Sequence, residues 1–124
     1  MPKKKILIVD DDKNITLYVK RALEKTEQYE VREENQAEHA LTAAQEFSPD
    51  LVLLDVLMPG AEGGMVAAQI EAHPRFKNVP IVFLTGTLTE EKSGMIGGLP
   101  FIAKPVSPET LISTIEQILK GKNK

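Results

Sequence analysis

The feature that most constrains the fold is a set of short, wholly apolar runs separated by longer segments with helical periodicity. A run without polar positions suits a parallel strand, because helices cover both faces of such a strand. Residues 29–33 instead alternate apolar and polar side chains, as an edge strand does. The apolar runs are residues 6–9, 51–54, 81–84 and 101–103. This alternation predicts a doubly wound α/β sheet built from five strand–helix units.

The segments between the runs place apolar residues three and four positions apart, which marks the buried face of a helix. The first helix is expected to be capped near Asp12. The last is expected to begin at Ser107-Pro108, where a capping hydroxyl precedes a first-turn proline. The predicted buried faces are Ile15, Tyr18, Val19, Ala22 and Leu23; Ala37, Ala40, Leu41, Ala44 and Phe47; and Leu111, Ile115, Ile118 and Leu119.

Acidic residues stand directly after two of the apolar runs: Asp10 and Asp11 after the first, and Asp55 after residues 51–54. Ligands of doubly wound sheets bind beyond the carboxyl ends of the strands, where the winding direction reverses. With strand order 2-1-3-4-5, the first and third strands are neighbours and the three carboxylates converge. Helix capping explains one such aspartate but not three. Burying ionised carboxylates close together is costly unless a cation or hydrogen bonds compensate, so a metal ion is expected here. Hard oxygen ligands favour Mg²⁺, with Mn²⁺ as the alternative.

Two further polar residues follow apolar runs. Thr85 directly follows residues 81–84, and Lys104 follows residues 101–103 and precedes Pro105. A lysine is most often an ordinary surface residue, but its position at a strand end places this one beside the acids. The Lys104-Pro105 bond is a candidate cis peptide, and the sequence leaves its isomer open. A hydroxyl and an ammonium are therefore expected at the acidic edge.

Four stretches, taken together and in order, resemble the receiver domain of bacterial two-component response regulators, the fold of the chemotaxis response regulator. They are residues 9–12 (VDDD), 50–60 (DLVLLDVLMPG), 79–86 (VPIVFLTG) and 101–105 (FIAKP). The resemblance extends over nearly the whole chain. It implies a flavodoxin-like (βα)5 three-layer sandwich with strand order 2-1-3-4-5. Residues 1–124 are then expected to form a single receiver domain, with no output domain in this chain.

The resemblance also implies a chemistry, in which Asp55 accepts a phosphoryl group from the phosphohistidine of a sensor histidine kinase or histidine phosphotransfer protein. The implied metal ligands are Asp10, Asp11, Asp55 and the main-chain carbonyl of Leu57. Thr85 and Lys104 would contact phosphoryl oxygens. Such a domain is a signalling switch rather than an enzyme with a separate substrate. It would present a changed surface to a downstream protein that the sequence does not identify.

Activation in the family couples the threonine hydroxyl to an aromatic residue on the fifth strand, and Phe101 occupies that position. Simple core packing of Phe101 is the alternative. Leu57 and Thr87, two positions beyond Asp55 and Thr85, lack the amide or carboxylate that orients attacking water in fast-switching relatives. Slow self-dephosphorylation is therefore predicted.

The segment between Thr85 and Lys104 is about three residues shorter than in typical receivers and contains Gly94, Gly97 and Gly98. Glycine disfavours helix by up to about 1 kcal/mol per position. We therefore expect a short or irregular fourth helix and leave the conformation of residues 89–100 open.

Composition excludes several classes of protein. A chain of 124 residues with no cysteine fits one domain without disulfides or thiolate metal sites. No apolar stretch approaches the roughly 20 residues of a membrane span, and a cytoplasmic location is expected. The net charge of −3 argues against direct nucleic-acid contact, since residues 3–5 form the one lysine run. His39 and His73 are expected on the surface.

Two other functions fit parts of the pattern. A pseudo-receiver would keep the fold as a protein-binding module without phosphorylation, but the intact acidic, hydroxyl and ammonium positions argue against it. A flavodoxin-like cofactor binder would share the topology. Its flavin phosphate would be repelled by the acidic loop after the first strand.

Overall fold

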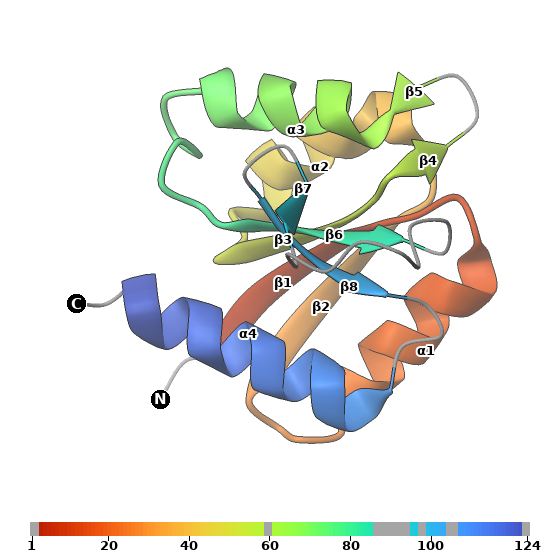
Figure 1. Ribbon diagram of the computed structural model, residues 1–124, viewed down its shortest axis with the longest axis vertical. Helices are drawn as coiled ribbons and strands as arrows, with labels where there is room; N and C mark the ends of the chain where they lie inside the picture. Colours follow the sequence, from red (N-terminus) through yellow and green to blue (C-terminus); the bar gives the residue numbers. More distant parts are fainter. Residues whose placement is uncertain (1–2, 59–60, 86–94, 97–98, 104–106, 123–124) are drawn as a thin grey trace.

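The computed structural model describes residues 3–58, 61–85, 95–96, 99–103 and 107–122, and it is a three-layer α/β sandwich (Figure 1). Its principal strands are β1 (Lys4–Val9), β2 (Tyr29–Glu34), β3 (Leu51–Asp55), β6 (Ile81–Thr85) and β8 (Leu99–Ala103). Its helices are α1 (Lys13–Glu24), the 3₁₀ turn η1 (Ala37–His39), α2 (Ala40–Phe47), α3 (Gly63–Ala72) and α4 (Pro108–Lys122). Helices α1 and α4 cover one face of the sheet, and α2 and α3 cover the other.

The five parallel strands are arranged as β2-β1-β3-β6-β8, which confirms the predicted order 2-1-3-4-5. The alternating strand β2 lies at the edge, as its sequence predicted. The reversal of winding falls between β1 and β3, which are direct neighbours. The carboxyl ends of these two strands therefore border the predicted ligand position.

Two short antiparallel pairs were not predicted. Strand β7 (Met95–Ile96) pairs with the start of β8 and extends the sheet beyond its five parallel strands. Strands β4 (Leu57–Met58) and β5 (Ala61–Glu62) form a separate hairpin after β3. The predicted short helix before β8 falls mainly on residues 86–94, which lie outside the described residues.

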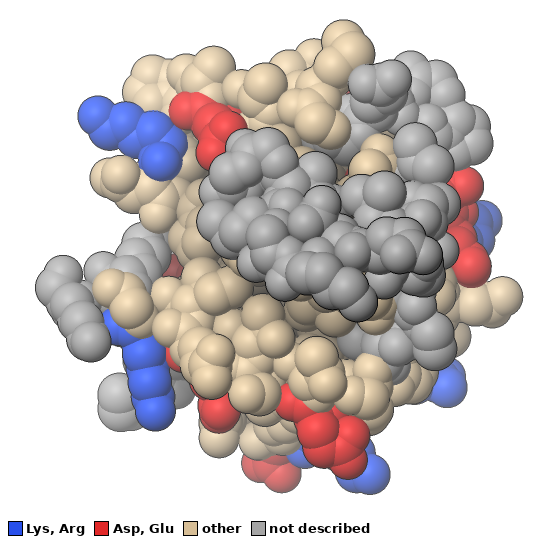
Figure 2. Space-filling model, viewed as in Figure 1, with Lys and Arg blue, Asp and Glu red and all other residues tan. Residues whose placement is uncertain are grey.

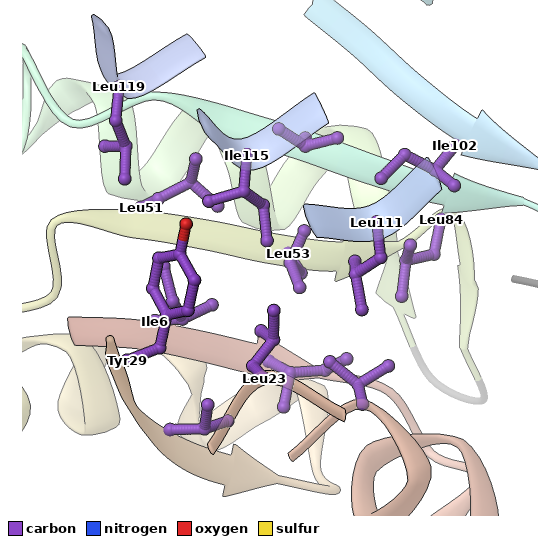
Figure 3. Packing of buried hydrophobic residues seen from close by; sticks show 14 residues of the cluster. Ile6, Leu23, Tyr29, Leu51, Leu53, Leu84, Ile102, Leu111, Ile115 and Leu119 are labelled. Carbon is purple, nitrogen blue, oxygen red and sulfur yellow. The ribbon is translucent and has the colours of Figure 1, made fainter. Parts of the chain in front are cut away.

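The core has two layers because the buried strands carry apolar side chains on both faces. Ile6 and Ile8 of β1 pack with α1 and α4, whereas Leu7 and Val9 pack with α2 and α3. Figure 3 shows the first layer, in which Leu111 and Ile115 of α4 point toward the sheet near Leu53. Consecutive apolar residues thus fill opposite layers, which is why the runs have no polar alternation.

The helix caps follow the sequence. The Asp12 side chain accepts a hydrogen bond from the Asn14 N–H at 2.9 Å and caps α1. The Ser107 hydroxyl oxygen accepts one from the Thr110 N–H at 3.2 Å at the start of α4. The prediction for Tyr18 was wrong, because 41% of this residue is exposed. The centre of the buried face of α1 is displaced toward Thr16, Val19 and Leu23.

No helix within the described ranges is long and apolar enough to cross a membrane.

Candidate functional site

The carboxyl edge of the sheet brings two predicted aspartates together. Val9 and Leu54 are partners in the pairing of β1 with β3, and Asp10 and Asp55 are the residues that follow them. Asp10 is fully buried and Asp55 is 6% exposed. Two acids are therefore held at the end of the central strands with little access to solvent.

Asp11 completes the acidic cluster from an exposed position on the loop after β1. One carboxylate oxygen from each of Asp10, Asp11 and Asp55 lies within 4.8 Å of the others. Three negative charges so close repel one another strongly where solvent is limited. A donor set made only of carboxylate oxygens fits Mg²⁺ or Mn²⁺ better than a softer metal. The geometry thus agrees with the metal preference read from the sequence.

Leu57 enters the same region through its main chain. It is the first residue of β4, two positions beyond Asp55, and pairs with Glu62 of β5. The hairpin thus begins directly at the acidic edge. The role of the Leu57 carbonyl as a metal ligand stays a prediction.

The loop that carries the acids is held by hydrogen bonds to its own main chain and to β2. The Asp12 N–H donates to Asp10 Oδ1 at 2.9 Å, and the Asp10 N–H donates to the Glu34 carbonyl at 3.1 Å. Asn35 Nδ2 donates to the Asp10 carbonyl at 2.8 Å. Sequence reasoning missed Asn35, although an amide directly after an edge strand at the ligand-binding edge was the available signal.

Thr85 lies on the other side of β3 from Asp10. It is the last residue of β6, it is 2% exposed, and it follows Leu84, the register partner of Asp55. The Val56 N–H donates to the Leu84 carbonyl at 3.1 Å, so the two strands stay paired up to the site. Thr85 is therefore one residue beyond the register partner of Asp55, at the same edge of the sheet as the acids, and its predicted contact with a phosphoryl group stays a prediction.

Phe101 is connected to Thr85 through the register of β6 and β8. Phe101 is paired with Phe83, and Thr85 is two residues beyond Phe83 on the same strand. Because strand side chains alternate, Thr85 and Phe101 project from the same face of the sheet. Phe101 is half-buried against the core layer of α2 and α3. This placement suits both core packing and a rotamer switch.

Lys104, Pro105 and Thr87 fall outside the described residues, so the roles predicted for Lys104 and Thr87 and the isomer of Lys104-Pro105 stay predictions. The two histidines contact residues other than the three aspartates: His39 is exposed and its Nδ1 lies 4.0 Å from Glu34 Oε2, and His73 Nδ1 accepts from the Arg75 N–H at 3.2 Å.

Surface charge on the visible face is dispersed. Figure 2 shows lysine and arginine side chains standing apart from one another, with acidic side chains among them. The described residues of this face therefore form no concentrated basic patch of the kind that binds phosphate backbones.

Comparison with known proteins gives one consistent result. The family described as response regulator receiver domain matches residues 6–116. Protein PilH of Pseudomonas aeruginosa is 32% identical over 121 residues, which cover 94% of this chain and 98% of PilH. Transcriptional regulatory protein ResD of Bacillus subtilis is 34% identical over 119 residues, which cover 94% of this chain and 48% of ResD. The chain spans about half the length of several curated relatives and about a quarter of another.

Solved structures agree with the sequence relatives. The chemotaxis response regulator CheY4 of Vibrio cholerae superimposes with a TM-score of 0.83 at 31% identity. The alignment covers 94% of this chain and 99% of CheY4.

Proposed function

The chain belongs to the response regulator receiver domain family, and on this premise we propose that it is a phosphoacceptor switch of a two-component phosphorelay. Asp55 is the proposed acceptor. The proposed donor is the phosphohistidine of a sensor histidine kinase or a histidine phosphotransfer protein. The observation that carries the proposal is the convergence of Asp10, Asp11 and Asp55, whose carboxylate oxygens lie within 4.8 Å at the carboxyl edge of the sheet.

Asp55 is suited to be the acceptor because it ends the central strand between the other acids and Thr85. One of its carboxylate oxygens forms a bond to phosphorus while the P–N bond of the donor breaks. The electron pair of that bond returns to the imidazole nitrogen, and the product is an acyl phosphate on Asp55. Phosphoryl transfer of this type depends mainly on positioning and electrostatics, so an ionised carboxylate needs no general base.

The acidic cluster is the proposed metal site, with Asp10, Asp11, Asp55 and the Leu57 carbonyl as ligands for Mg²⁺ or Mn²⁺. A bound divalent ion neutralises charge on the phosphoryl oxygens. The chain's own residues position the group: the Thr85 hydroxyl donates to one phosphoryl oxygen. We assign Lys104 to another, as a point charge.

We propose that phosphorylation changes the conformation of Thr85 and, through it, the packing of Phe101. A phosphoryl group on Asp55 draws the Thr85 hydroxyl toward it, and Phe101 on the same face of the sheet repacks. The changed surface would then be read by a downstream protein rather than by nucleic acid or a membrane. We further propose that residues 1–124 act as one receiver domain in the cytoplasm, without a separate substrate. The acyl phosphate is expected to last, since Leu57 and Thr87 carry no amide or carboxylate that could orient the attacking water.

Acetyl phosphate and Mg²⁺ provide the test. Intact mass should show the gain of one phosphoryl group, and this gain should disappear with a chelator or in Asp55→Asn. Asp50→Asn is the matched control, because Asp50 precedes the same strand at its opposite end and binds the Lys5 N–H. Its phosphorylation should be normal.

A phosphoryl group that persists in Asp55→Asn would show that another residue is the acceptor. No gain in the native chain, from acetyl phosphate or from a phosphorylated histidine phosphotransfer protein, would instead favour a protein-binding module that is not phosphorylated.

A further inference from the structure

Asn35 contacts the acid-bearing loop from the end of the edge strand β2. Its Nδ2 donates to the Asp10 carbonyl at 2.8 Å and to the Thr16 hydroxyl oxygen at 3.1 Å. The Thr16 hydroxyl donates in turn to the Lys13 carbonyl at 3.2 Å, which leaves its oxygen as an acceptor. Both partners of Asn35 are therefore acceptors, and the amide must present its NH₂ group to them.

This contact replaces a missing hydrogen bond of the β1–β2 ladder. Val9 pairs with Glu34, and the Asp10 N–H donates to the Glu34 carbonyl. If the parallel ladder continued, the Gln36 N–H would bind the Asp10 carbonyl. The Gln36 N–H instead donates to Glu34 Oε2 at 3.1 Å, and the chain turns away into η1. The Asn35 side chain therefore donates to the Asp10 carbonyl in place of the Gln36 N–H.

The consequence for Asp10 is a main chain fixed on both sides. Its N–H is bound by Glu34, its carbonyl by Asn35, and its Oδ1 accepts from the Asp12 N–H. This fixation matters because Asp10 is fully buried and one of its carboxylate oxygens lies within 4.8 Å of an oxygen of Asp11 and of Asp55. Repulsion among the three charges would otherwise push the loop away from Asp55. Removing a group that holds a metal ligand in place typically lowers metal affinity by about 10- to 100-fold.

We propose that Asn35 is a positioning residue of the metal pocket: it holds Asp10 at the distance from Asp11 and Asp55 that a divalent cation requires. The connection to Thr16, which is fully buried, anchors the same amide to the first turn of α1. That the pocket binds a metal ion rests on the proposed function, whereas the hydrogen bonds of Asn35 do not depend on it.

The experiment measures Mg²⁺ affinity by calorimetry on the full chain for Asn35→Ala and for Asn35→Leu, which keeps most of the volume. Thr26→Ala is the matched control. Thr26 also makes two hydrogen bonds, just beyond the opposite end of α1, donating to the Leu23 carbonyl at 2.8 Å and accepting from the Gln28 N–H at 3.2 Å. Urea unfolding of all three variants separates loss of stability from loss of affinity.

Both Asn35 variants should raise the Mg²⁺ dissociation constant roughly 10-fold, and Thr26→Ala should leave it within about twofold at similar stability. Asn35 variants that bind Mg²⁺ as tightly as Thr26→Ala would overturn the inference. Phosphorylation by acetyl phosphate is followed separately. A native chain that binds Mg²⁺ but gains no phosphoryl group would contradict the proposed function while the effect of Asn35 on affinity still stands.

Discussion

Asp10 and Asp55 lie side by side at the carboxyl edge of the sheet because the residues that precede them are register partners in the pairing of β1 with β3. Their proximity thus follows from the topology of the sheet. The repulsion between them is built into the folded state, together with that from Asp11. A cation that relieves this repulsion should stabilise the fold as well as assist chemistry.

Asp11→Asn is therefore expected to raise the free energy of unfolding in the absence of metal. It should also reduce the stabilisation that added Mg²⁺ provides. In the native chain, Mg²⁺ at 100 times its dissociation constant should add about 2.7 kcal/mol. The variant should gain clearly less at the same concentration, because it lacks one ligand charge. Thermal unfolding with and without Mg²⁺ measures both effects. An equal gain in the two proteins would remove Asp11 from the proposed ligand set.

Thr85→Ala should separate phosphorylation from its readout. Without the hydroxyl, the ring resonances of Phe101 should no longer shift when Asp55 is phosphorylated, as followed by NMR. Thr85→Ser is the control: it loses one buried methyl group, at a cost of about 1 kcal/mol, but keeps the donor and the shift. A Phe101 response that survives in Thr85→Ala would contradict the proposed coupling.

Asp12→Ala should destabilise the fold by about 1 kcal/mol, because α1 loses the carboxylate that binds the Asn14 N–H. Asp12→Asn keeps an acceptor at the cap and removes the same charge, so its stability should stay close to that of the native chain. Urea midpoints of the two variants give the comparison. Equal loss in both would assign the effect to charge rather than to capping.

Tyr29 should make the fold sensitive to alkali. Burial and, to a smaller extent, the charge of Glu116 raise the pKa of its hydroxyl above the ordinary 10.0. Below about pH 9 both the folded and unfolded chains keep the proton, and the full stability is present. Above that pH the unfolded chain ionises first, so stability falls until the pH passes the folded pKa.

Tyr29→Phe should lose less stability at alkaline pH, because the variant keeps the buried ring (Figure 3) and lacks the ionisable hydroxyl. Urea midpoints measured from pH 9 upward test this. Glu116→Gln should lessen the alkaline loss only slightly, since burial is the larger cause. An identical pH dependence in Tyr29→Phe and the native chain would assign the alkaline loss to other groups.

The class of fold and the proximity of the three aspartates could be predicted from residue patterns. Continuous apolar runs such as residues 51–54 require cover on both faces, and that requirement leads to a doubly wound parallel sheet. Acids placed directly after such runs must meet at one edge. The predicted proximity of Asp10, Asp11 and Asp55 is confirmed for this reason, since it needs only strand order and not side-chain detail.

Other features could not be predicted from local patterns, because they depend on packing or hydrogen bonding with residues that are distant in the sequence. Tyr18 has the right spacing for a buried helix face, yet it is exposed, and Thr16, Val19 and Leu23 form the buried face of α1 instead. Strand β7 exists because its residues can pair with the start of β8, which no local pattern signals. Asn35 reaches the Asp10 carbonyl because β2 turns away one residue too early to continue the ladder. Periodicity records local burial, whereas register and long-range hydrogen bonds are set when separate elements pack.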